Sequence, residues 1–369
     1  MKTKDKIINF IKSDVVLSVA IVLAIVTCFF VPPDKEYLGY FDYSTLICLF
    51  CMLAVVAGLK STNVFELISR KLIGLFHTRR AVIYALVFGT FFFDMIVAND
   101  MSLITFLPLT YIVLHSTKND KYLAFTFIMQ TIAANMGGMI TPYGNPQNLY
   151  LYSYYNINTT EFFSILLVQS ITVAVLLWIC CAFVHNEPLK LRKNSKIIIS
   201  KKELCIYSIL FILVILSIFR VIPYLITLAI VVLTILIMDR KRFKQIDYAL
   251  IATFFVFFVF SGNIARIPAI KEFISEIVVK NTLLAGIVSC QFISNVPTAI
   301  FLSKFTTNYK ELLVSVNIGS LGILISSLAS LITLKEFLKH QPKNFWKYLI
   351  MYTIFNTLFL VVLLLVTTL

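Results

Sequence analysis

The sequence contains little charge and no long polar segment. Only 14% of its 369 residues are Asp, Glu, Lys or Arg, whereas 59% are hydrophobic. The longest polar interval, residues 185–203, is far shorter than an independently folding domain. A separate soluble domain is therefore excluded. The chain has instead a series of apolar windows of about 20 residues, which predicts an all-α polytopic membrane protein.

Residues suited to metal or nucleic-acid binding are also scarce or unfavourably placed. All four histidines fall in loops or at the ends of predicted spans, and the seven cysteines show no metal-ligand spacing with them. We therefore expect no cofactor, and no metal site beyond a possible Na⁺ site. The net charge of +14 comes from Lys and Arg in short loops, where membrane anchoring explains it. The expected partner is the lipid bilayer, not nucleic acid.

Nine membrane crossings are predicted. They cover residues 15–31, 43–59, 121–152, 162–184, 204–219, 222–238, 248–260, 312–334 and 346–366. No small-residue cleavage site follows the first apolar run, so this run is expected to remain as a span. Residues 63–76 and 264–279 are amphipathic and are expected to lie in the membrane interface. Residues 81–114 and 283–305 are apolar with polar centres, which favours two re-entrant helical hairpins.

The order of these elements is the same in both halves of the chain. Each half has a span ending in Gly, an interfacial helix, a hairpin with Asn at its centre and a broken span. The pairs are Gly58 with Gly262, Asn99 with Asn295, and Asn135 with Asn317. We predict a first repeat over residues 1–184, a basic cytoplasmic linker over 185–203, an extra crossing over 204–220 and a second repeat over 221–369. The extra crossing inverts the second repeat, so the two are inverted repeats.

The loop charges predict the topology. With nine crossings, every loop rich in Lys and Arg falls on the cytoplasmic side, whereas the intervening loops are poor in Lys and Arg. We therefore expect a multi-pass protein of the cytoplasmic membrane, with its N-terminus in the cytoplasm and its C-terminus outside.

The stretch ANMGGMITPYGNPQNL, residues 134–149, differs most from its surroundings. Pro142 and Pro146, together with three glycines, make an unbroken helix improbable. Non-helical backbone at membrane depth persists only where protein buries it or where it lines an aqueous cavity. The second half has a corresponding break at residues 326–331, so the sequence predicts one broken transmembrane helix in each repeat.

Four polar centres result, at residues 99–100, 141–148, 294–295 and 326–330, and each has the composition of a helix start. Half-helices that begin at mid-membrane point free N–H groups and the positive dipole end into a cavity. Such ends bind anions without Arg or Lys, and these centres contain neither. The predicted substrate-binding residues are Asn99, Thr141, Gly144, Asn145, Asn148, Ser294, Asn295, Ser326, Ser327 and Ser330.

Two acids lie well inside apolar stretches, and such acids are commonly functional. Asp100 is predicted to hold the coupling ion, either Na⁺ or a proton. For Asp94, a hydrogen bond or hairpin cap and a role in coupling are equally consistent with the sequence. The full predicted ion-coupling set is Asp100, Asn99, Gly137, Asn295 and Gly319.

Four segments, VANDMSLITFLPL, ANMGGMITPYGNPQNLYLY, FISNVPTAIFLS and NIGSLGILISSLASLI, resemble the paired hairpin-tip and broken-helix motifs of the ion transporter superfamily. This group includes divalent-anion:sodium symporters, citrate transporters, arsenite permeases and sodium/proton antiporters. The resemblance implies a scaffold domain and a mobile transport domain, a homodimer and an elevator motion. The symporters carry Ser-Asn-Thr at both tips, where this chain has Ala98-Asn99-Asp100 and Ser294-Asn295-Val296. The first tip is more similar to the arsenite-permease and antiporter branch.

The predicted function is secondary active transport of a small anion, of the carboxylate type such as citrate or a dicarboxylate, coupled to Na⁺ or H⁺. Arsenite or antimonite efflux and sodium/proton antiport are the alternatives within this class. An intramembrane enzyme using Asp94 and Asp100 is the alternative of another class. It is disfavoured because no Gly precedes either acid and no Gly-x-Ser-Gly motif accompanies a membrane histidine.

Overall fold

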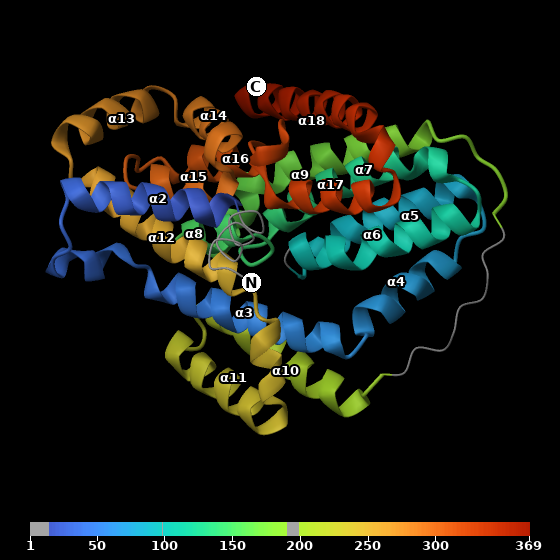
Figure 1. The fold of residues 1–369 in the computed structure, drawn as a ribbon, viewed down its shortest axis with the longest axis horizontal. Coiled ribbons are helices and arrows are strands. Elements are labelled where there is room, and N and C mark those ends of the chain that lie inside the picture. The colour runs from blue at the N-terminus through green and yellow to red at the C-terminus, as the bar shows by residue number, and fades with distance from the viewer. Residues whose placement is uncertain (1–14, 98, 190–198) are drawn as a thin grey trace, which may run out of the picture.

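The computed structural model describes residues 15–97, 99–189 and 199–369. Within these ranges the chain is helical, with a single isolated β-bridge between Thr78 and Pro188 and no strand (Figure 1). The predicted all-α class is therefore confirmed. The basic N-terminal residues, Ala98 at the first hairpin tip and the basic core of the linker lie outside the described residues.

The first half contains α2 to α9, with the interfacial segment as α4 and the first hairpin as α5 and α6. These helices are α2 Val15–Phe30, α3 Tyr43–Ser61, α4 Val64–Gly74, α5 Arg79–Asp94, α6 Asn99–Ser116, α7 Leu123–Gly137, α8 Pro146–Tyr154 and α9 Thr159–Ala182. In the described residues, the second half contains nine α-helices, one more than the first. Its helices are α10 Lys201–Ile218, α11 Tyr224–Met238, α12 Tyr248–Ala265, α13 Pro268–Lys280, α14 Thr282–Ile293, α15 Asn295–Leu302, α16 Tyr309–Ile318, α17 Leu328–His340 and α18 Phe345–Thr368.

Five helices in the described part of the chain are long and apolar enough to cross a membrane. They are residues 43–61, 120–140, 159–182, 248–265 and 342–368, and a sixth candidate is the bent pair α13 and α14. Helices α2 and α11 are apolar but shorter, and α10 begins with three charged residues. The chain is a multi-pass membrane protein, and the predicted total of nine crossings stays a prediction.

Two expected helix ends were placed wrongly. Gly58 and Gly262 were predicted to end their spans, but α3 continues to Ser61 and α12 continues to Ala265. A Cβ on Gly58 would lie 2.1 Å from the Tyr207 ring, and one on Gly262 would lie 2.4 Å from the Tyr40 ring. Both glycines therefore sit inside helices, where the lack of a side chain lets a tyrosine ring pack against the backbone.

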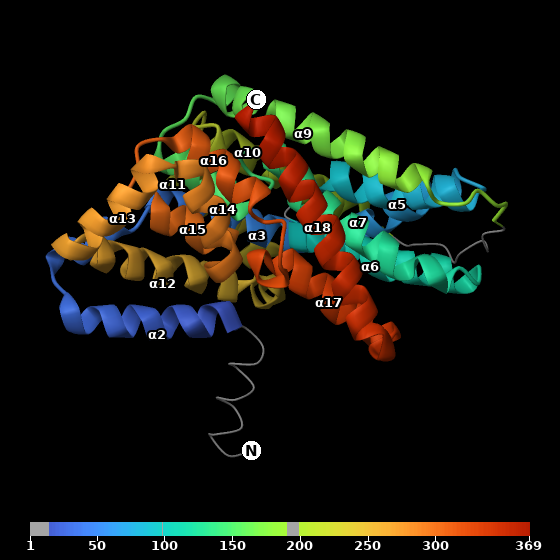
Figure 2. The same cartoon turned by 90° about the horizontal axis from the view of Figure 1, so that it is seen from above.

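The helices form groups that mix the two halves of the chain. Helix α2 packs against α12, whereas α10 and α11 pack together against α3 at one side of the molecule (Figure 1). In both views α5 and α6 lie toward the right end, whereas α14 and α15 lie left of the centre and α13 extends beyond them (Figures 1 and 2). Helix α8 from the first broken span packs on α15, and α17 from the second packs on α6. Each broken span therefore connects its own hairpin with the hairpin of the other half.

Candidate functional site

All four polar centres are helix starts, as predicted. Helix α6 begins at Asn99, α8 at Pro146, α15 at Asn295 and α17 at Leu328. Asn145 before α8 and Ser327 before α17 have extended backbone angles, as N-cap residues do, whereas Ser294 before α15 has a positive φ. Proline at the first position of α8 costs no hydrogen bond, because that N–H has no intrahelical partner. The breaks therefore expose backbone N–H groups in the middle of two otherwise apolar spans.

The two broken spans are joined by hydrogen bonds between their polar side chains. The Asn317 amide donates to Asn148 Oδ1 over 2.7 Å, and the Gln147 amide donates to Asn317 Oδ1 over 3.3 Å. On the other side, the Ser327 hydroxyl donates to Asn135 Oδ1 over 2.7 Å. All five residues are almost fully buried. Asn135 and Asn317, which the predicted repeats pair with each other, therefore each bond to the break in the other half of the chain.

In the first break, the side chains of Asn148 and Thr141, which are predicted to bind substrate, form hydrogen bonds with backbone carbonyl oxygens of the protein. The Asn148 amide group lies 3.0 Å from the Met139 carbonyl oxygen and 3.3 Å from those of Gly138 and Thr141. The Thr141 hydroxyl donates to the Met95 carbonyl over 3.1 Å, which ties the break to the first hairpin. These two side chains hold the shape of the break, and their binding of cargo stays a prediction.

The second break is stabilised in a similar way. The Ser326 hydroxyl lies 2.7 Å from two carbonyl oxygens of its own loop, and the Ser330 hydroxyl accepts from Tyr352 over 2.7 Å. Ser327 accepts from the Ala329 N–H and so caps α17. The Ser294 hydroxyl donates to the Ser326 carbonyl over 3.3 Å. The structure thus brings the second tip and the second break together, as the sequence analysis expects of one site.

The two hairpin tips use asparagine in the same way. Asn99 Oδ1 accepts from the Asp100 N–H over 3.0 Å, and Asn295 Oδ1 accepts from the Val296 N–H over 2.9 Å. The backbone of Ser294 has φ of 72° and ψ of 161°, a region that only glycine adopts without strain. Strain of this kind is typical of functional positions, and it points to the second tip as part of the site.

The glycines of the breaks allow close backbone contacts. A Cβ on Gly137 would lie 2.2 Å from the Phe91 carbonyl oxygen, and one on Gly319 would lie 2.5 Å from the Ser315 carbonyl oxygen. At Gly144 the nearest atom would be the Gly138 carbonyl oxygen, at 2.4 Å. Close backbone packing therefore explains why glycine occupies these three positions. The predicted roles of Gly137 and Gly319 in ion coupling and of Gly144 in substrate binding stay predictions.

The two intramembrane acids occupy different environments. Asp94, the last residue of α5, is fully buried, whereas Asp100 is partly exposed. Asp94 Oδ1 lies 2.9 Å from the Ser102 hydroxyl, but Asp94 Oδ2 has no hydrogen-bond partner. Ser102 and Gln147 are not among the predicted site residues. Ser102 lies in the first turn of α6 and Gln147 follows the predicted first residue of α8, so their positions at helix starts were the available signal.

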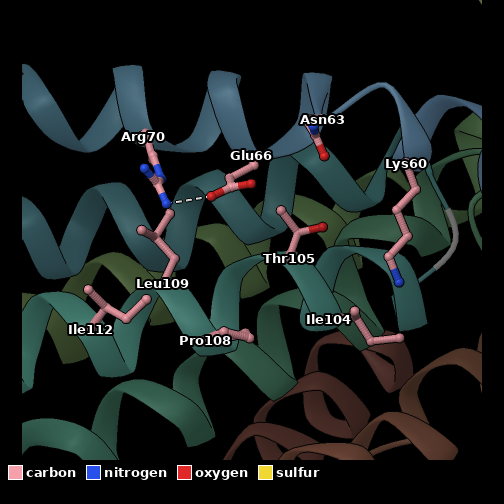
Figure 3. Close-up of a pocket in the computed structure, with 9 residues that line it drawn as sticks. All are labelled: Lys60, Asn63, Glu66, Arg70, Ile104, Thr105, Pro108, Leu109 and Ile112. Atoms are coloured by element: carbon pink, nitrogen blue, oxygen red, sulfur yellow. Dashed lines mark ion pairs between the residues drawn. The ribbon is translucent and has the colours of Figure 1, made fainter. Parts of the chain in front are cut away.

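Three pockets lie beside the first hairpin, and two of them have charged side chains in their lining. The first, of about 230 Å³, lies between α4 and α6 (Figure 3). Its lining is Lys60, Asn63, Glu66, Arg70, Ile104, Thr105, Pro108, Leu109 and Ile112. The second, of about 310 Å³, includes Lys60 and Met101, the residue after Asp100. Glu66 pairs with Arg70 over 2.5 Å, which leaves Lys60 as the shared cation of the two pockets. These pockets approach the first tip from α3 and α4.

Apolar spans that break at buried polar centres, with half-helices meeting across the two halves of the chain, are the architecture of a membrane transporter. The comparison with known families agrees. A sequence model described as "Citrate transporter" matches residues 6–319, and the chain belongs to this family, within the ion transporter superfamily.

Three relatives are also transporters or membrane proteins. An uncharacterized transporter of Methanocaldococcus jannaschii is 34% identical over 300 residues, covering 80% of this chain and 81% of the relative. The inner membrane protein YbiR of Escherichia coli is 24% identical over 92% of this chain and 91% of its own length. The putative transporter arsB of Dictyostelium discoideum is 26% identical over 37% of this chain and 24% of its own length.

Proposed function

We propose that the protein is a secondary active transporter that moves a small carboxylate anion across the cytoplasmic membrane, coupled to Na⁺ or H⁺. The observation that carries this proposal is the reciprocal contact between the two breaks, where Asn148 and Asn317 meet at buried helix starts. Such helix starts bind anions through free N–H groups and the helix dipole. Their meeting point is where cargo is held.

The transport cycle that we propose uses two inverted repeats with re-entrant hairpins. The repeated element order and the packing of α8 on α15 and of α17 on α6 support this arrangement. In an elevator motion the hairpins and breaks would move as one body against α2, α3 and α10 to α12. The N-terminus would lie in the cytoplasm and the C-terminus outside, and the chain would act as a homodimer.

The substrate class follows from charge. The family description names citrate, a multiply charged carboxylate. A fixed carboxylate beside such an anion is unfavourable unless a cation lies between them. The acids of the first hairpin, Asp94 and Asp100, therefore support the proposal of an accompanying cation.

Arsenite or antimonite efflux is the second candidate, and sodium/proton antiport is a third. Both have support from Asn99-Asp100 at the first tip, and efflux also has support from the partial similarity to the putative transporter arsB. These alternatives need no site for a multiply charged anion. The substrate panel of the test separates them from carboxylate uptake.

The test is flux into proteoliposomes that contain the purified full chain. Labelled citrate, succinate, sulfate and arsenite are offered under imposed Na⁺ or H⁺ gradients. We expect carboxylate flux that follows one of the gradients and that Asn148→Ala abolishes. The matched control is Asn263→Ala, because Asn263 is equally buried but lies in α12 and bonds to Thr27.

If no gradient drives any flux, the proposed function is wrong. If arsenite alone moves, efflux replaces carboxylate transport. Asp100→Asn tests the predicted coupling residue separately, because full ion coupling in this variant would rule Asp100 out of that role.

A further inference from the structure

The turn between α10 and α11 carries an arginine in a backbone conformation that favours glycine. Arg220 has a φ of 63°, in the left-handed region. Its N–H donates to the Ser217 carbonyl, and the N–H of Val221 donates to the Leu216 carbonyl, both over 2.9 Å. These two bonds form a Schellman motif, in which the left-handed residue is usually glycine. The end of α10 therefore does not itself explain why this residue is arginine.

The Arg220 side chain bonds to the end of another helix, α8. Its guanidinium donates to the Tyr152 carbonyl over 2.6 Å and to the Ile157 carbonyl over 3.2 Å. It also lies over the Tyr152 ring, 4.4 Å from the ring centroid. A cation is stabilised at the C-terminal end of a helix, where the dipole is negative and carbonyl groups lack helical partners. The rigid fork of the guanidinium can bond both carbonyls at once.

This contact joins two groups of helices that the proposed motion separates. Helices α10 and α11 pack on α3, in the group with α2 and α12, whereas α8 belongs to a broken span and packs on the second hairpin. Polar contacts such as Asn263 with Thr27 and Arg266 with Asp34 stay inside the first group. The packing of α3 on α8 and of α12 on α15 also crosses between the groups. Apolar packing is non-directional, whereas the hydrogen bonds of Arg220 select one position of α8.

The same turn also touches the first break, just before α8 begins. The ring of Phe219 lies 6.0 Å from the ring of Tyr143 in this break and 6.5 Å from the ring of Tyr152, measured between centroids. Two adjacent residues of the turn therefore contact the chain at both ends of α8. The Arg220 side chain is exposed to solvent. Water can therefore replace both carbonyl groups when the contact opens, so the contact can release and form again.

We infer that Arg220 is a latch that holds the end of α8 against the α10–α11 turn and opens when the hairpins and broken spans move. Residues that keep a strained backbone are typical of switch regions, and here the two bonds to α8 offset the strain. The inference rests on the proposed transport motion and names a contact that controls it. Loss of the latch should shift the population toward the conformation in which α8 has moved away.

The test measures the distance between the two groups of helices in the purified full chain, reconstituted in liposomes. Spin labels are attached through Val221→Cys and Thr160→Cys, at exposed positions beside the latch and three residues after Ile157. The three native cysteines that are not buried are first replaced by serine. Pulsed electron paramagnetic resonance then gives the distribution of distances between the labels. We expect Arg220→Gly to raise the share of a longer distance by roughly threefold or more.

A control variant separates the latch from the backbone strain. Arg220→Gly relieves the strain and keeps the end of α10, but it removes the guanidinium. Lys118→Gly is the matched control, because Lys118 has a φ of 57° at the end of α6 and precedes α7, in the group that contains the first hairpin. It should leave the distances unchanged. An equal shift in Lys118→Gly, or the wild-type distribution in Arg220→Gly, would overturn the inference.

A second variant keeps the charge at this position. Arg220→Lys retains the cation but cannot span the two carbonyl groups, so it should raise the share of the longer distance less than Arg220→Gly does. If the glycine variant does not fold, the lysine variant decides: a larger share of the longer distance supports the latch, and the wild-type distribution overturns it.

The distances are measured without substrate, so the latch and the transport function are tested separately. If Arg220→Gly leaves the distances unchanged but the wild type moves carboxylate under a gradient, the latch is wrong and the proposed function stands. If Arg220→Gly lengthens the distance but the wild type moves no anion under any gradient, the latch stands and the proposed function is wrong.

Discussion

The hydrogen bond between Asn148 and Asn317 allows a quantitative test of the contact between the two breaks. Asn317→Ala removes the 2.7 Å bond to Asn148 and the 3.3 Å bond from Gln147. It leaves the oxygen of Asn148 and the NH₂ group of Gln147 buried without these partners. Each such loss costs about 1–3 kcal/mol in proteins generally, although hydrogen bonds between membrane helices average about 0.6 kcal/mol. We expect Asn317→Ala to destabilise the protein by about 2 kcal/mol.

Asn148→Ala should cost more, because the Asn148 amide group also lies within reach of three carbonyl oxygens of the first break. The double variant should cost less than the two single variants together, since their shared bond is lost only once. We expect a coupling energy of about 1 kcal/mol. This value would measure the link between the two halves of the chain directly.

The assay is reversible unfolding of the four proteins of this cycle in mixed detergent micelles. A control cycle pairs Asn148→Ala with Asn263→Ala, since no hydrogen-bond partner is shared by these two side chains. The control pair should be additive to within about 0.5 kcal/mol. If Asn148 and Asn317 are additive to the same degree, the two breaks are not coupled through this bond, and the reciprocal contact cannot carry the proposed function.

Three further predictions concern other contacts. Gly286→Ala should destabilise the protein by about 1–3 kcal/mol in the same assay, because its Cβ would lie 1.9 Å from the Ser315 hydroxyl oxygen; an unchanged midpoint would contradict this packing. The Arg266 guanidinium hydrogen-bonds Asp34 and lowers the pKa of that carboxyl below 3.8. This ion pair therefore stabilises the folded protein above pH 3.8, and the stabilisation is lost as the pH falls through the lowered pKa. Arg266→Gln should therefore flatten the pH dependence of the unfolding midpoint in this acid range, whereas an unaltered profile would exclude the pair. Arg79→Lys should speed trypsin cleavage of the linker after α9, measured by mass spectrometry, because an ammonium cannot contact all the acceptors of the buried guanidinium; equal cleavage rates would count against this.

Local chemistry made the helix starts predictable. Pro146 fixes its own φ and lacks an N–H, so it favours the first position of a helix whatever packs around it. The tip asparagines and Ser327 favour N-caps for similarly local reasons. The ends at Gly58 and Gly262 were wrong because a glycine inside a pattern looks like a break, whereas its role here depends on Tyr207 and Tyr40, which are distant in the sequence.

The same contrast applies to the candidate site. Sequence alone shows that Asn148 and Asp94 are polar groups at membrane depth, but not whether their hydrogen-bonding capacity is already used. In the fold, the Asn148 amide forms hydrogen bonds with a carbonyl oxygen of the first break and with Asn317, whereas Asp94 Oδ2 has no hydrogen-bond partner.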